Sequence, residues 1–362
     1  MHQFGVYVHV PFCATRCDYC AFATWTDRDH LMADYAAAVV AELGRAREEE
    51  QLPPATSVFV GGGTPSRLPG PLLAEVLHSV ERAEGAEVTV ECNPEGADPG
   101  RFAAWRDAGV TRVSFGVQSM VPRVLESLGR CHQPGTVADA AALAGAYGFR
   151  CNVDLIFGAA AETDADLSAT LDAVLSLDPA PSHVSAYALT VEPGTPLARD
   201  PARHPDEDVL ACRYEVVDGV LGDAGYRWYE ISNWARPGQE CRHNQLYWRQ
   251  GDYRGVGCAA HSHRQGRRWW NIRTPERYVA AVRAGARPTA GEEVLDEHQR
   301  ALEALALSLR TSEGVPASAL PDDPALDGLV SLDDGRAVLT VRGRLVADEL
   351  SRQLRVPTIL RA

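Results

Sequence analysis

Residues 6–20 read Val-Tyr-Val-His-Val-Pro-Phe-Cys-Ala-Thr-Arg-Cys-Asp-Tyr-Cys, so three cysteines follow a short apolar strand candidate. Soft thiolate ligands favour zinc, copper(I) or iron–sulfur clusters. Structural zinc takes four ligands, and no fourth cysteine lies nearby. Three thiolates on a cluster of four irons leave one iron open, which the amino and carboxylate groups of a methionine moiety can chelate. The spacing therefore predicts that Cys13, Cys17 and Cys20 hold a [4Fe–4S] cluster, with zinc or plain structural thiols as the alternatives.

The 362-residue chain has a formal net charge of −14, with 45% hydrophobic and 23% charged residues. This composition is typical of a globular protein with a full core. Nucleic-acid binding depends on clustered Lys and Arg, so no nucleic-acid partner is expected. The first residues do not resemble a signal peptide, and no stretch reaches the ~18 apolar residues of a spanning helix. We therefore expect a cytoplasmic protein that does not span a membrane and keeps its nine cysteines reduced.

Strand-like and helix-like segments alternate over the first two thirds of the chain. Six βα units in a row predict a parallel sheet, either open and doubly wound or closed into a barrel. Glycine or polar residues stand at the end of each strand candidate, which is typical of a barrel with its site on the top face. Since six units are too few for an eight-fold barrel, we predict an α/β fold with a partial (β/α)6 TIM-like barrel. The strand candidates lie near residues 6–10, 57–60, 88–92, 112–115, 151–156 and 183–188.

The composition changes after about residue 226, where Trp, Tyr and His become frequent. We predict a core barrel over residues 1–235, a connecting segment over 236–285 and a small C-terminal domain over 286–362. Helix, hairpin and helix candidates in the last range suggest a winged-helix-like unit. These candidates cover residues 301–309, 329–340 and 344–354.

The cysteine loop, with its CxxxCxxC spacing and Tyr19 before the last cysteine, resembles that of the radical S-adenosylmethionine (SAM) superfamily. The preceding Tyr7-Val-His-Val-Pro-Phe is similar to the branch containing the oxygen-independent coproporphyrinogen oxidase HemN and the haem chaperone HemW. The resemblance runs over nearly the whole chain and implies that the cluster binds SAM. It also implies that Tyr7 and Tyr19 lie beside SAM and the cluster, although Tyr7 alone is equally well an ordinary strand residue.

Further residues match SAM contacts of that family. Gly62, Gly63 and Thr64 match the stretch that receives the methionine amino group, and glycine permits close backbone approach. Arg130 is a candidate bidentate donor to the methionine carboxylate. Asp154, an acid in an apolar strand, needs a partner such as a ribose or Arg130. The expected SAM contacts are Tyr7, Tyr19, Gly62, Gly63, Thr64, Glu91, Gln118, Arg130 and Asp154.

Two departures separate this sequence from the oxidase that it resembles. The oxidase has a further cysteine two residues after the triplet, where this chain has Phe22. The oxidase also has a long N-terminal extension, whereas Tyr7 here already lies in the first strand candidate. Both departures favour the chaperone branch.

The stretch His243-Asn-Gln-Leu-Tyr247-Trp248 matches the HNxxYW element that marks HemW-type chaperones. His243 offers an imidazole to haem iron, and Tyr247 and Trp248 offer faces to a porphyrin. The alternative is a satisfied histidine with packing aromatics. His9 and His261 are rival ligands.

The resemblance implies a haem chaperone that hands haem to an acceptor protein, for which a membrane-associated respiratory apoprotein is one candidate. Its cofactors are the [4Fe–4S] cluster, SAM and haem. The alternative is an oxygen-independent coproporphyrinogen III oxidase-type enzyme of porphyrin biosynthesis. In that enzyme an electron donor reduces the cluster, and SAM cleavage yields a radical that abstracts hydrogen from a propionate. Because of Phe22, we do not expect this activity.

Overall fold

The computed structural model describes residues 3–50 and 52–357. Six strands pair in parallel in chain order, which confirms the predicted βα alternation. The strands are β1 (Phe4–Val10), β2 (Ala55–Gly62), β3 (Arg82–Cys92), β4 (Arg112–Gln118), β5 (Arg150–Phe157) and β6 (His183–Ala188). The helices that follow them are α1 (Met32–Glu50), α2 (Gly70–His78), α3 (Pro99–Asp107), α4 (Pro122–Ser127), α5 (Pro134–Ala146), α6 (Asp164–Leu175) and α7 (Glu207–Asp223).

The sheet extends beyond these six strands at both edges. Its full order is β12-β11-β10-β9-β1-β2-β3-β4-β5-β6-β8-β7. Strand β9 pairs in parallel with β1, and β10 to β12 continue antiparallel. Three of these strands lie in the range 236–285, which the sequence predicts as a connecting segment, so that range builds part of the large sheet. The added strands are β7 (Arg227–Glu230), β8 (Asn233–Ala235), β9 (Asp252–Val256), β10 (His261–Arg264), β11 (Arg267–Asn271) and β12 (Thr289–Val294).

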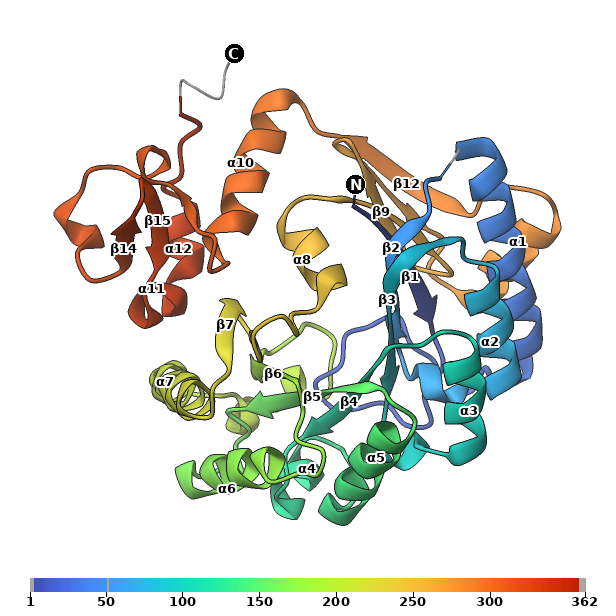
Figure 1. The fold of residues 1–362 in the computed structure, drawn as a ribbon, viewed down its shortest axis with the longest axis horizontal. Helices are drawn as coiled ribbons and strands as arrows, with labels where there is room; N and C mark the ends of the chain where they lie inside the picture. Colours follow the sequence, from blue (N-terminus) through green and yellow to red (C-terminus); the bar gives the residue numbers. More distant parts are fainter. Residues whose placement is uncertain (1–2, 51, 358–362) are drawn as a thin grey trace.

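The sheet curves around an interior, with helices α1 to α6 on its outer face (Figure 1). Helix α8 (Arg242–Trp248) lies inside the curve and contacts β1 and β2. Helix α9 (Pro275–Arg283) packs on α1 at the outer side. The interior is therefore closed at one place by a helix rather than by further strands.

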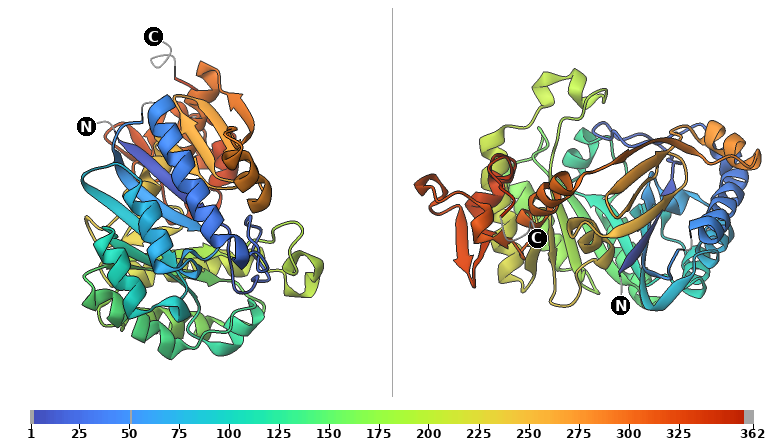
Figure 2. Two further views of the ribbon diagram at one scale, coloured as in Figure 1. Left: turned by 90° about the vertical axis from the view of Figure 1, so that its right-hand side faces the viewer. Right: turned by 90° about the horizontal axis from the view of Figure 1, so that it is seen from above.

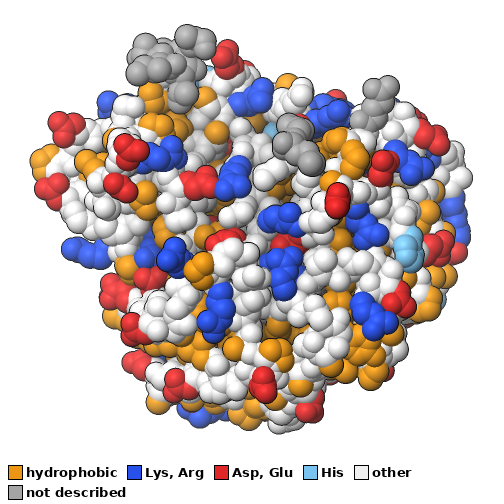
Figure 3. Space-filling model, in the orientation of Figure 1, with side chains coloured by type: hydrophobic (Ala, Val, Ile, Leu, Met, Phe, Trp, Pro, Cys, Tyr) orange, Lys and Arg blue, Asp and Glu red, His pale blue; other side chains and the backbone are white. Residues whose placement is uncertain are grey.

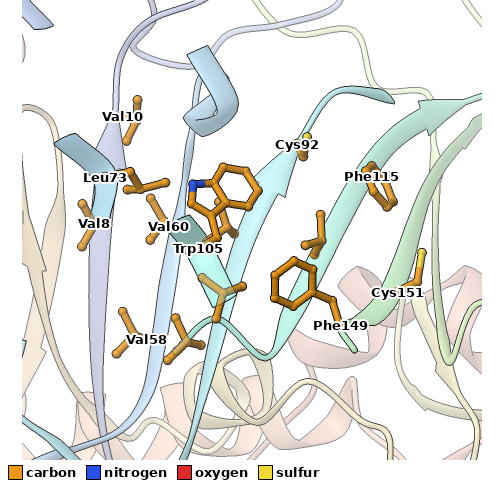
Figure 4. Packing of buried hydrophobic residues seen from close by; sticks show 14 of the residues in the cluster. Val8, Val10, Val58, Val60, Leu73, Cys92, Trp105, Phe115, Phe149 and Cys151 are labelled. Carbon is orange, nitrogen blue, oxygen red and sulfur yellow. The ribbon is translucent and has the colours of Figure 1, made fainter. Parts of the chain in front are cut away.

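Apolar side chains between the sheet and its outer helices form the main core (Figure 4). Valines of β1 and β2, such as Val8 and Val60, pack with Leu73 of α2, and Trp105 of α3 is fully buried. Burying a side chain of this size contributes roughly 1.5–3 kcal/mol. Because these residues alternate along their strands, the remaining side chains of the same strands point into the interior.

The C-terminal part has a separate small core. The helix and the hairpin are found where the sequence predicts them, but the predicted last helix over 344–354 is wrong in its extent. Two short helices replace it, because the backbone leaves helical geometry at Val346 (φ −118°, ψ 25°). The elements are α10 (Glu297–Leu309), β13 (Val315–Pro316), β14 (Val330–Asp333), β15 (Arg336–Leu339), α11 (Val341–Leu345) and α12 (Ala347–Ser351).

This small unit packs on α7 through a buried ion pair between Arg344 and Asp218, with Nη1 and Oδ1 2.7 Å apart. The guanidinium also lies 4.3 Å from the ring centroid of Trp228. Figure 2 shows the unit beside the barrel in two further views. On the face in Figure 3, acidic and basic side chains are interspersed. In the described part of the chain, no helix is both long and apolar enough to cross a membrane.

Glu42 joins the added strands to the barrel. This buried carboxylate of α1 accepts hydrogen bonds from Arg254 (3.2 Å), the Gly257 N–H (3.0 Å), Asn271 Nδ2 (2.8 Å) and the Tyr278 hydroxyl (2.7 Å). Four segments beyond residue 250 therefore depend on one side chain from the first helix.

We expect Glu42→Ala to lower the free energy of unfolding by about 3–5 kcal/mol, because it leaves the buried Arg254 charge with only the partly exposed Glu50 as its partner and removes the acceptor of three other buried donors. Glu49→Ala is the matched control on the same helix, since Glu49 pairs with Arg287 at the surface and such pairs contribute less than about 1 kcal/mol. Urea unfolding measures both variants. Equal losses would contradict the role assigned to Glu42.

Candidate functional site

The three cysteines lie in one loop that follows β1. The loop is tied at its ends, since the Cys13 N–H donates to the Trp25 carbonyl (3.0 Å) and the Cys20 N–H donates to the Cys17 carbonyl (3.2 Å). All three thiols are partly exposed and free of disulfides. Such a loop fits a cluster that takes one thiolate at each of three corners.

The end of β2 packs directly against this loop. The Gly63 N–H donates to the Val10 carbonyl, and the Thr64 N–H donates to the Phe12 carbonyl, both at 2.8 Å. The Thr64 hydroxyl lies 3.6 Å from the Cys13 thiol. A Cβ at position 63 would lie 2.8 Å from the Phe12 carbonyl oxygen and 3.0 Å from Cys13 Sγ, so only glycine fits there.

Arg130 reaches the same loop from the other side. Its Nη1 lies 3.7 Å from Cys17 Sγ, while Nη2 donates to Asn93 Oδ1 (3.0 Å) and the Gly116 carbonyl (2.9 Å). A fixed positive charge beside a thiol suits a thiolate that ligates metal. Tyr19 lies in the same loop, half-buried, and packs against a small apolar cluster.

A long connection after β6 also holds the cysteine loop. The Leu197 N–H donates to the Asp18 carbonyl (3.0 Å), and Arg203 pairs with the Asp18 carboxylate (2.8 Å). Both views in Figure 2 show this connection projecting beside the loop. The cysteine loop is therefore held by three separate parts of the chain.

Glu91 and Asp154 point into the interior from β3 and β5. Glu91 accepts a hydrogen bond from the Gly62 N–H (3.1 Å), and burial, helped by nearby Asp154, raises its pKa to about 8. Burial also raises the pKa of Asp154, which accepts from Ser114 (2.8 Å) and from Asn152 (2.8 Å). Asp154 is therefore paired with polar side chains of β4 and β5 rather than with Arg130. The suggested pairing with Arg130 is wrong.

Gln118 ends β4 with an unusual backbone. Its φ is +64°, a conformation that side chains other than glycine rarely adopt, and the β4–β5 register shifts between Gly116 and Gln118. A Cβ at position 116 would lie 3.0 Å from Gln118 Nε2. Strained backbone at a strand end is common at ligand sites, and the role of Gln118 in SAM binding stays a prediction.

Glu91 and Asp154 line an interior cavity of about 150 Å³. Tyr7 lines it, and its hydroxyl lies 3.1 Å from His9 Nδ1. The structure brings Tyr7, Glu91, Asp154 and His243 together around this one cavity. Gly62, Gly63, Thr64 and Tyr19 lie instead with the cysteine loop.

The HNxxYW element forms α8 inside the barrel. His243 is 1% exposed, and its two ring nitrogens lie 2.9 Å from the Ser57 hydroxyl and 2.9 Å from the Tyr247 hydroxyl. Burial lowers its pKa to about 4, so the ring is neutral. In this conformation neither nitrogen has a free lone pair for iron. Trp248 is only half-buried, so the three motif residues do not form one open face.

The rival histidines differ in accessibility. His9 is buried, with Nε2 3.0 Å from the Ala23 carbonyl oxygen and Nδ1 bonded to Tyr7. His261 is exposed, and its ring stacks on Trp270 with centroids 5.8 Å apart. His261 is therefore the more accessible of the two.

Sequence reasoning missed a second layer of polar side chains in the interior. Glu87, Arg112, Asn152 and His183 are all buried near the beginnings of β3 to β6. Their signal is visible in the sequence, because each is a polar residue within two positions of apolar strand residues. The prediction considered only polar residues at the carboxyl ends of the strands, so it did not include these four side chains.

Comparison with known proteins agrees with this geometry. The model of the radical SAM superfamily matches residues 7–174. The chain is 45% identical to heme chaperone HemW of Mycobacterium tuberculosis H37Rv over 97% of this chain and 94% of that protein. It is 38% identical to heme chaperone HemW of Escherichia coli over 71% and 69% of the two chains.

A solved structure shows the same fold. Coproporphyrinogen III oxidase (HemN) from Escherichia coli, described as a radical SAM enzyme, superposes with a TM-score of 0.84 at 21% identity, over 97% of this chain and 89% of that one. At this identity the likeness concerns the fold alone. The 45% identity along nearly the full length shows that the chain belongs to the heme chaperone HemW family of radical SAM proteins.

Proposed function

We propose that this chain binds one haem and transfers it to an acceptor protein. The observation that carries the proposal is the 45% identity to a protein named heme chaperone HemW along 97% of this chain. The HNxxYW element supports it as well. A membrane-associated respiratory apoprotein is the acceptor that we favour.

Cys13, Cys17 and Cys20 are the proposed ligands of a [4Fe–4S] cluster. The support is their position in one tethered, partly exposed loop, with Arg130 beside Cys17 to offset negative charge. A reduced cluster of this kind supplies an electron that can cleave bound SAM, and an electron donor is then required.

The residues around the loop are proposed to bind SAM. Gly62, Gly63 and Thr64 offer backbone beside the cysteines, where a methionine amino group would lie. Glu91 and Asp154 stand deeper, where hydroxyls of a ribose can be hydrogen-bonded. Tyr7, Tyr19, Gln118 and Arg130 complete the proposed contacts.

Replacing Cys13, Cys17 or Cys20 with Ala should abolish the brown [4Fe–4S] absorption after anaerobic reconstitution, because each removes one of three ligands. Cys212→Ala is the control, since Cys212 is exposed and lies on α7, outside the cysteine loop. Iron and sulfide analysis with visible spectroscopy measures the loss. A triple variant that still held about four irons per chain would falsify the assignment.

We expect no conversion of coproporphyrinogen to protoporphyrinogen. Phe22, 62% exposed, stands where the oxidase that the sequence resembles has a cysteine. The assay needs SAM, a reductant and strict anaerobiosis, and turnover above the enzyme-free control would place the protein with the oxidases. Slow SAM cleavage without substrate would not place the protein with the oxidases, because this cleavage requires only the cluster.

His243 is the proposed haem ligand, and ligation requires that Nε2 release the Tyr247 hydroxyl. Tyr247→Phe removes this competing bond, so it should strengthen haem binding about fivefold, from a hydrogen bond of about 1 kcal/mol. His243→Ala should shift the Soret band and weaken binding about tenfold. Haem titration of reconstituted protein measures both. If neither variant changes the titration, the ligand is not His243, and His261→Ala is tested in the same way.

A further inference from the structure

Two buried polar groups in the interior cavity have no hydrogen-bond partner among the described residues. They are Nε and Nη1 of Arg112 and Oγ1 of Thr89. Both side chains are 1% exposed, and both line the cavity of about 150 Å³. They stand opposite each other in the β3–β4 ladder. Buried polar groups of this kind are nearly always paired, so each calls for a partner.

The guanidinium of Arg112 is held rigidly on its other side. Its Nη2 donates to Glu87 Oε2 (3.3 Å) and to the carbonyls of Gln239 (2.8 Å) and Glu240 (3.3 Å). The unpaired nitrogens therefore cannot turn toward another protein acceptor without breaking these bonds. A donor fixed in advance in this way is suited to a ligand.

The charges around the closed end of the cavity favour an anion. Among residues 3–50 and 52–357, Glu87 is the carboxylate that pairs with Arg112, and it also pairs with Arg150 (3.2 Å). Burial, and then the positive charges of Arg112 and Arg150, lower the pKa of neighbouring His183 well below its usual range. Two cations, of which Arg112 is buried and Arg150 is partly exposed, thus face one buried anion.

The volume of the cavity and the acidic side chains in its lining limit the kind of anion that it can bind. A water molecule occupies about 30 Å³ in the liquid, so this cavity has room for a group of a few non-hydrogen atoms. Glu91 lines the same cavity two residues beyond Thr89 on β3, which is about 7 Å, and Asp154 lines it four residues beyond the register partner of Arg112 on β5, which is about 13 Å. These acids disfavour a doubly charged phosphate, whereas a singly charged carboxylate is matched by the one Arg112 side chain.

We propose that this cavity binds a carboxylate on a short alkyl arm, with Arg112 and Thr89 as its hydrogen-bond donors. Two sources share this chemistry. One is a propionate side chain of a tetrapyrrole bound over the cavity, which rests on the proposed haem binding. The other is a free short-chain carboxylate, which does not.

Thr89→Val is the sharpest variant, because the Thr89 hydroxyl has no hydrogen-bond partner within the described part of the chain and its removal should leave the fold intact. Arg112→Gln removes the charge. Arg287→Gln is the matched control, since it removes a surface charge that pairs with Glu49 and does not line the cavity. Each variant is reconstituted anaerobically and compared with the unmodified protein.

Isothermal titration with sodium propionate, against sodium chloride, tests the free carboxylate. Titration with haem and with haem dimethyl ester, in which both propionates are esterified, tests the tetrapyrrole. At least one acid should bind the unmodified protein and Arg287→Gln. Thr89→Val should weaken this binding about tenfold, and Arg112→Gln should weaken it more. In Thr89→Val and Arg112→Gln, haem should then bind no more tightly than haem dimethyl ester.

Unchanged binding of both acids in Thr89→Val and Arg112→Gln would overturn the proposal and leave water as the partner of these groups. Binding of neither propionate nor haem by the unmodified protein would also overturn it. If the unmodified protein bound propionate but not haem, and Thr89→Val weakened propionate binding, the proposed haem function would be refuted. The carboxylate site would then stand.

Discussion

The contact between the cysteine loop and the end of β2 is the constraint on which the candidate cofactor site depends. Backbone hydrogen bonds at 2.8 Å from Gly63 and Thr64 bring two chain segments together with no room for a side chain between them. At Gly62, φ is +112°, and a Cβ would lie 2.4 Å from the His9 ring. The loop is thereby held over the edge of the parallel sheet, so that ligands on the loop and side chains of the strands face one space.

A second constraint acts at the other end of the interior. Glu87 is 0% exposed, and a carboxylate buried so completely must be paired. Arg112 and Arg150 supply the charges, while the Cys241 thiol and the His243 N–H approach the other oxygen at 3.5 Å and 3.3 Å. These bonds draw the beginning of α8 into the barrel. The helix therefore lies inside because an ionic group, rather than an apolar one, anchors it.

The sequence predicted the parts of this protein that depend on local pattern. The alternation of β1 to β6 with helices follows from periodicity, and the cysteine loop follows from spacing. The pairing of β9 with β1 could not be predicted, because these strands are about 250 residues apart and nothing in a local window links them. A satisfied, buried His243 is the alternative that the sequence left open, but its partners could not be predicted, since Ser57 and Glu87 lie far away in the chain.

Between the two ends of the interior runs a continuous chain of hydrogen bonds. Asp154 accepts from Asn152 (2.8 Å), whose side-chain oxygen is bonded to His183 Nδ1, and His183 Nε2 lies 2.8 Å from the Tyr229 hydroxyl. That hydroxyl accepts in turn from Asn244 of α8 (3.2 Å). Asp154, Asn152 and Asn244 have further partners in Ser114, Ser185 and Glu230, and an unpaired buried group at any of these links costs about 1–3 kcal/mol. These hydrogen bonds connect the layer beside the cysteine loop to the HNxxYW helix.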